Sequence, residues 1–226
     1  MASAALPRRD VPRRDVEARA RLTEVAGRAR PVTPAGERTI PLRGGLGTLV
    51  PGASLTRGTV VRVAGVRGGG AGVVAFELAA AVTALGEWAA AVDLDGSLGA
   101  LAAAEAGVEL ERFAVVRRVP PARWASVVAA LIEGTSLVLA EVPRGLGIVD
   151  ARRLVARARE RGTVLVAHET GTARWPGDAA LTLCAEACTW EWAEGGGHLR
   201  GGRVHVRVDG RGAAARPRTG ELARAV

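Results

Sequence analysis

The chain has 226 residues, of which 48 % are hydrophobic and 3 % aromatic, and its formal net charge is +8. This length and apolar content fit one α/β domain with a sizeable core and short terminal segments. There is no signal-peptide pattern and no run of about 18 apolar residues, and the two cysteines fit a reducing compartment. We therefore expect a cytoplasmic protein without a membrane partner.

The positive charge lies at the two ends of the chain. Residues 1–40 hold nine arginines and five acids, and residues 195–226 hold seven arginines and two acids. The middle, 41–194, holds fifteen arginines and sixteen acids and is near neutral. We therefore divide the chain into a basic N-terminal arm at 1–40, partly helical or disordered, a core domain at 41–212 and a basic C-terminal tail at 213–226. Basic ends favour DNA or an acidic protein surface as partner, and solubility of the tails explains them equally well.

In chain order, residues 15–29 have helical composition, and strands then alternate with helices from residue 42 onward. Nearly all-apolar strands are expected at 59–64, 88–93, 113–116, 136–140 and 163–167. Helices are expected between them, at about 72–85, 97–106, 121–133 and 148–161. This alternation predicts a parallel sheet that is covered by helices on both faces. The strand pattern then continues without helices at 179–184, 187–193 and 203–209, which predicts an antiparallel extension at the edge of the sheet.

A glycine-rich turn, Gly65 to Gly72, follows the first of these strands. Its spacing is that of a phosphate loop, G-x-x-x-x-G-K-[ST], with Gly65 and Gly70 in register. Ala71 replaces the lysine that reaches the β- and γ-phosphates, and Gly72 replaces the hydroxyl that binds Mg²⁺. We therefore expect no catalytic residues and no ATP cofactor, and we interpret the glycines as allowing close packing. The alternative is anion binding by the backbone of the turn, with Arg67 in the role of the lysine.

Acidic side chains are expected at the carboxyl ends of neighbouring strands. Asp93 is the last residue of the second expected strand, Asp95 lies two residues later, and Glu141 directly follows the fourth. An open parallel sheet forms its binding site at this edge, and three carboxylates there are able to bind a metal ion. We interpret them instead as relics of a lost site that pair with an arginine such as Arg144, so no metal is predicted.

Several motifs, in this order, resemble the RecA-type ATPase core over about residues 42–215. They are the lead-in Leu46 to Val61, the glycine turn, the acidic strand end Val92 to Gly96, the link Gly107 to Arg112, the strand Leu137 to Glu141 and the late strand Gly201 to Val208. The resemblance implies a RecA-like P-loop NTPase core, a mostly parallel sheet flanked by helices with antiparallel C-terminal strands. It places Asp95 at the catalytic glutamate and Glu141 at the Walker B aspartate. It also places His168 and Glu169 in the segment that senses the γ-phosphate.

Within the RecA-like group, the short chain, the degenerate loop and the Arg/Gly-rich C-terminus resemble the ImuA-prime family of the actinobacterial mutasome. The resemblance implies a non-catalytic accessory protein in damage-induced translesion DNA synthesis and mutagenesis, part of the SOS response. Its implied partner is an ImuB-like Y-family polymerase homologue, through which an error-prone C-family polymerase is reached indirectly at the damaged nucleoid. Two alternatives are a DNA-binding module that acts through basic tails and a divergent ATPase with an unconventional P-loop. Self-association is a further alternative.

Arginine and tryptophan are the candidate interaction residues, because both dominate binding energy at interfaces. The candidates are Arg153, Arg157, Arg161, Trp175, Arg216 and Arg218. The first three recur every four residues on one stripe of a predicted helix, and the last two belong to the basic tail. Trp175 lies beside an arginine in a loop, which predicts an exposed anchor. Trp190 and Trp192 alternate on a predicted strand and are expected to pack in the core or at the sheet edge, with stacking on single-stranded bases as the alternative. Cys184 and Cys188 are expected to pack inside.

Overall fold

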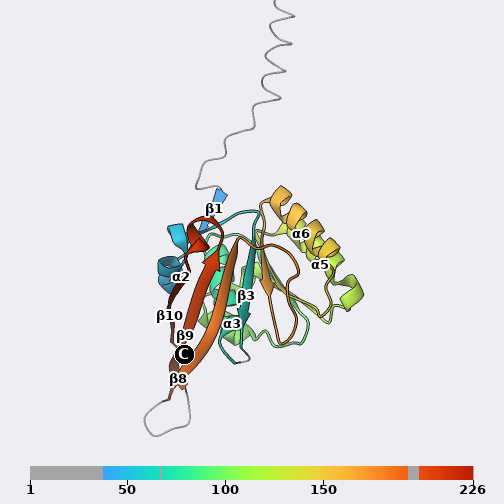
Figure 1. The fold of residues 1–226 in the computed structure, drawn as a ribbon. Helices are drawn as coiled ribbons and strands as arrows, with labels where there is room; N and C mark the ends of the chain where they lie inside the picture. The colour runs from blue at the N-terminus through green and yellow to red at the C-terminus, as the bar shows by residue number, and fades with distance from the viewer. Residues whose placement is uncertain (1–37, 67, 193–198, 226) are drawn as a thin grey trace, which may run out of the picture. The chain divides into compact units, whose positions relative to one another are not determined.

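The computed structural model describes residues 38–66, 68–192 and 199–225 (Figure 1). These residues fall within one compact unit, 36–226. The helix predicted at 15–29, and all but the last three residues of the predicted N-terminal arm, lie outside the described residues. No helix in the described ranges is long and apolar enough to cross a bilayer.

An eight-stranded sheet forms the centre of this unit. Its strands are β3 (Val60–Gly65), β4 (Ala89–Asp93), β5 (Phe113–Arg117), β6 (Leu137–Glu141), β7 (Val164–His168), β8 (Leu181–Trp192), β9 (Leu199–Gly210) and β10 (Arg218–Ala225). They lie side by side in the order β10-β9-β8-β3-β7-β6-β4-β5. The six strands β8-β3-β7-β6-β4-β5 are parallel to one another, whereas β9 is antiparallel to both β8 and β10. The mostly parallel sheet is therefore confirmed, and its five core strands match the prediction to within one residue at each end.

Helices cover both faces of the sheet (Figure 1). They are α2 (Gly44–Leu49), α3 (Ala71–Thr83), α4 (Ala100–Glu105), α5 (Pro121–Gly134) and α6 (Ile148–Arg161), with the 3-10 turns η2 (Pro51–Ala53), η3 (Leu110–Arg112) and η4 (Gly212–Ala215). Val61 and Leu139 belong to the core cluster with α3 and α4, and Val60 and Leu165 to the cluster with α5 and α6. Successive strand residues point to opposite faces, so a strand covered on both faces must be apolar throughout. A separate two-stranded sheet pairs β1 (Thr39–Pro41) with β2 (Ser54–Thr56).

The chain connections reverse direction between β4 and β6, which are neighbours in the sheet. From β4 the chain passes through α4 to β5 at the edge, and from β6 it passes through α6 to β7 nearer the centre. Ligands of open α/β sheets bind outside the carboxyl ends of the strands at such a reversal. In addition, β7 and β6 lie between β3 and β4, an order that differs from the dinucleotide-binding fold.

The C-terminal strands differ from the prediction in two ways. β8 is one strand of 12 residues rather than two, because a bulge between Ala185 and Ala187 carries the strand past the break in its pattern. The segment 213–226, expected to be a basic tail, instead contributes η4 and the edge strand β10. β10 is anchored by Leu222, which is 1 % exposed in the core cluster that includes Leu49 of α2. Leu222 is the only long apolar side chain of β10, so the sequence of β10 lacks the alternation of apolar and polar residues from which a strand is predicted.

Candidate functional site

A cavity of about 760 Å³ lies at the carboxyl ends of β3, β4, β6 and β7. Its volume is in the usual range for small-molecule sites. The residues singled out in the sequence that line it are Gly65, Gly70, Ala71, Gly72, Asp95, Glu141, His168 and Glu169. Phe76, Leu98 and Trp190 add apolar walls from α3, the loop before α4, and β8. The glycine turn and the acidic strand ends thus face one common space.

The glycine turn packs closely against β8 and β9. Gly70 has a φ of +90°, and a Cβ atom there would lie 2.6 Å from Cγ2 of Val204. A Cβ atom at Gly65 would lie 2.7 Å from the carbonyl oxygen of Ala185. Both positions therefore require glycine for packing, whether or not the turn binds a ligand.

The two positions that distinguish this turn from a phosphate loop begin α3. Ala71 and Gly72 line the cavity, and their N–H groups belong to the first helical turn, which offers them no acceptor within the helix. A Cβ atom at Gly72 would meet no atom within 4 Å. A serine side chain therefore fits there, so packing is not what excludes the Mg²⁺-binding hydroxyl. Arg67 lies outside the described residues.

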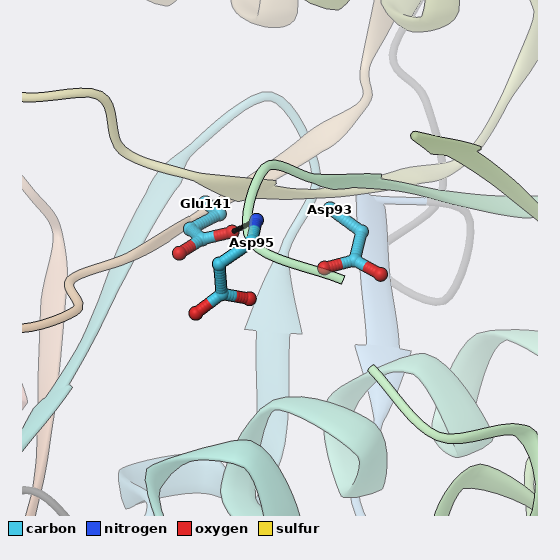
Figure 2. Close-up of side chains that lie close together, drawn as sticks. All are labelled: Asp93, Asp95 and Glu141. Carbon is cyan, nitrogen blue, oxygen red and sulfur yellow. Dashed lines mark hydrogen bonds between the residues drawn. The ribbon is translucent and has the colours of Figure 1, made fainter. Parts of the chain in front are cut away.

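Figure 2 shows the three carboxylates, Asp93, Asp95 and Glu141. One oxygen of each lies within 4.8 Å of one oxygen of the other two. Asp93 is fully buried and accepts hydrogen bonds from Nε of Arg117 and the N–H of Gly96, each at 2.9 Å. The arginine beside it is therefore Arg117 rather than the expected Arg144. The reason is the pairing of β4 with β5, which places Arg117 directly opposite Asp93.

Glu141, which is 6 % exposed, links the end of β4 to the segment after β7. Its Oε2 accepts the N–H groups of Leu94 at 2.7 Å and Asp95 at 3.3 Å, and its Oε1 accepts the Thr170 hydroxyl at 2.8 Å (Figure 2 shows the bond from Asp95). Asp95 itself is exposed and accepts the N–H of Ser97 at 2.9 Å. With both oxygens holding donors, the Glu141 carboxylate connects the segment after β4 to the segment after β7.

His168 is buried beside Glu141 and lines the cavity. Burial lowers the pKa of its imidazole, and the charges of Glu141 and Asp95 offset only part of this effect. The neutral ring therefore dominates near pH 7. Its nitrogens form no hydrogen bond with any residue that the structure describes.

Glu169 organises the loop that follows β7. It accepts two hydrogen bonds from the Arg62 guanidinium, at 2.9 and 3.1 Å, and one from the N–H of Trp175 at 2.9 Å. The bond from its N–H fixes the backbone of Trp175. The residue is 5 % exposed, and its indole packs in the core cluster that includes α5 and α6. The prediction of Trp175 as an exposed anchor is therefore wrong. Its loop composition did not reveal that a buried carboxylate holds this backbone.

Of the two expected places for Trp190 and Trp192, the core is wrong, because they are 40 % and 65 % exposed. β3 ends at Gly65, opposite Ala185, so the later part of β8 has no parallel neighbour on that side. Trp190 consequently forms a wall of the cavity. Cys184 and Cys188, expected inside, are half-buried and do not form a disulfide with each other.

The arginine stripe of α6 is largely paired with acids. Arg157 and Arg161 both contact Glu133 of α5, at 3.0 and 2.6 Å, and Arg153 lies 3.8 Å from Asp150. These pairs reduce the charge that the stripe offers to a partner. In the C-terminal segment, Arg216 and Arg218 are both exposed.

The fold and the site define an α/β protein whose mostly parallel sheet carries a cavity above a glycine-rich turn. Residues 48–177, more than half of the chain, match the family model described as the MT3502 N-terminal domain, and the chain belongs to this family. The matched region contains the glycine turn and all three carboxylates, whereas β8, β9 and β10 follow it. A search of curated proteins found no match to the chain.

Proposed function

We propose that this chain is a RecA-like accessory protein of translesion DNA synthesis that does not hydrolyse ATP. In this proposal it is an ImuA-prime relative that bridges an ImuB-like Y-family polymerase homologue to the mutasome. An error-prone C-family polymerase is reached indirectly through that homologue. The chain joins the nucleoid when DNA is damaged.

The arrangement of the sheet supports a RecA-like core. The glycine turn joins the central strand β3 to α3, acids follow β4 and β6 at the reversal of the connections, and antiparallel strands extend the sheet beyond β8. This is the arrangement that the motif resemblance implies. The family match covers the same turn and the same acidic strand ends.

The observation that carries the non-catalytic assignment is the chemistry of the cavity. ATP hydrolysis needs a cation at the phosphates, a ligand for Mg²⁺ and a group that positions the attacking water. Ala71 and Gly72 supply neither of the first two. Asp95, which the resemblance places at the catalytic glutamate, is exposed in the cavity, but without the first two groups it has no bound phosphate on which to act. A domain that keeps this sheet without these groups still offers its surfaces to partners.

Substitution of surface arginines tests the proposed partner. Arg216→Ala combined with Arg218→Ala alters exposed residues, whereas deletion of 213–226 would remove β10 from the core. We expect the double substitution to weaken binding to the purified polymerase homologue and to lower damage-induced mutagenesis. The matched control is Arg123→Ala combined with Arg152→Ala, at exposed positions of α5 and α6 that are not candidate interaction residues. Equal mutagenesis in wild type and in a full gene deletion would remove the proposal.

DNA binding is a second candidate, favoured by the exposure of Arg216 and Arg218. Each phosphate contact contributes roughly 0.7–0.9 to the slope of log affinity against log salt concentration. The double substitution should therefore reduce that slope by about 1.4–1.8. A slope that does not change would dismiss these arginines as DNA contacts.

A further inference from the structure

Two carboxylates of the cavity have no cation beside them. Asp95 and Glu141 line the cavity, and no arginine that the structure describes lies within ion-pair distance of either. Arg117 pairs with Asp93 alone. Arg144, exposed at the rim, is the one described arginine of the lining. The described part of the cavity therefore presents uncompensated negative charge.

We propose that the cavity is a docking site for an arginine side chain on an extended segment of a partner protein. This inference rests on the function proposed above in one respect, because it requires that no nucleotide occupies the cavity. It adds a defined site on this chain and a defined ligand chemistry.

His168 is an independent sign of a ligand. Its side chain is 7 % exposed and borders the cavity, yet its ring forms no hydrogen bond with the described residues. A largely buried side chain that borders a cavity and has no hydrogen-bond partner among the described residues is available to a ligand that enters the cavity. A neutral imidazole nitrogen accepts a hydrogen bond from a guanidinium N–H.

Trp190 gives the cavity an aromatic wall that suits the same ligand. Guanidinium groups stack on indole rings, and the aliphatic stem of arginine packs along apolar surface. Phe76, Leu98 and Ala102 provide that surface. The indole of Trp190 packs on Gly202 of β9, where an added Cβ atom would lie 2.8 Å from Cε3 of the indole. β9 therefore supports the ring from behind.

A metal ion and a phosphate both fit this cavity less well than a guanidinium. A carboxylate has about four lone-pair sites, and Glu141 already accepts three hydrogen bonds, so little is left for a metal's coordination shell. A phosphate would approach Asp95 and Glu141 without the lysine that offsets their charge. A guanidinium gains from both carboxylates through its charge alone and brings five N–H donors.

Two matched peptides test the proposal on the full chain. The probe is acetyl-Gly-Arg-Gly-Arg-Gly-amide, and its control replaces both arginines with citrulline, which keeps the shape and removes the charge. NMR indole signals of the five tryptophans report the contact. We expect the arginine peptide to shift the Trp190 signal and to bind at least about fivefold more tightly than the control.

Variants locate the contact within the cavity. Asp95→Asn changes an exposed carboxylate and should weaken binding at least about fivefold, whereas Glu111→Gln, an exposed acid outside the lining, should not. Arg144→Ala should strengthen binding, because it removes the like charge at the rim.

Equal binding of the two peptides, or unchanged binding by the Asp95→Asn variant, would overturn the docking site. A shift of the Trp190 signal by Mg²⁺ or ATP but not by the arginine peptide would overturn it as well. ATP turnover is measured separately on the same protein. Failure of the docking site and failure of the non-catalytic assignment are therefore distinguishable.

Discussion

Alanine at two nearby glycines of the turn should change stability in opposite directions. At Gly70, where φ is +90°, a Cβ atom would lie 2.6 and 2.7 Å from the two methyl groups of Val204. A left-handed conformation costs an L-residue about 1–2 kcal/mol, and overpacking of a core costs about 1–3 kcal/mol. Gly70→Ala should therefore lower the free energy of unfolding by about 2–5 kcal/mol.

Gly72 is the matched control, because a Cβ atom there meets nothing within 4 Å and the residue lies in the first turn of α3. Gly72→Ala should raise the free energy of unfolding by up to about 1 kcal/mol, since alanine restricts the unfolded chain and favours the helix. Urea denaturation followed by circular dichroism measures both changes. A wild-type midpoint for Gly70→Ala would refute the close packing of the turn against β9. A lowered midpoint for Gly72→Ala would refute the open space at that position.

Four other substitutions test the packing and charges of the fold by the same denaturation assay. Arg117→Ala leaves Asp93 buried without its cation and should cost about 2–4 kcal/mol, and a cost below about 1 kcal/mol would contradict this pairing. Trp175→Ala should cost about 3–5 kcal/mol, whereas Trp192→Ala, at an exposed position, should change stability little; equal effects would contradict the assigned burial. Burial raises the pKa of Glu77 from 4.5 to about 7, so its charged form is disfavoured in the folded state and stability falls as pH rises through this window. Glu77→Gln should remove this loss and raise stability at pH 8, and an unchanged pH profile would speak against it.

The core of the fold could be predicted because its strands are apolar throughout. β4 and β6 are buried on both faces, which leaves the same pattern in any parallel sheet. The carboxyl ends of parallel strands meet at one edge, so the glycine turn and the acids could be expected to face one another. The Asp93–Arg117 pair could not be predicted, because it depends on the register of β4 against β5.

The C-terminal strands and the tryptophans were harder to predict, for related physical reasons. The bulge in β8 shifts the strand by one residue, which a simple alternation does not reveal. The length of β8 beyond β3 exposes Trp190, although its sequence resembles that of a packed strand. The backbone N–H of Trp175 donates a hydrogen bond to the Glu169 carboxylate, and this contact, made only in the folded loop, holds the backbone of the buried indole. In each case tertiary context overrides the local pattern.

ATP hydrolysis by the full chain tests the central claim, a RecA-like accessory protein without catalysis, most directly. The account predicts a rate at background, with and without single-stranded DNA, because Ala71 and Gly72 lack the cation and the Mg²⁺ ligand that phosphoryl transfer needs. A steady turnover that is abolished by Asp95→Asn or by Glu141→Gln would contradict it.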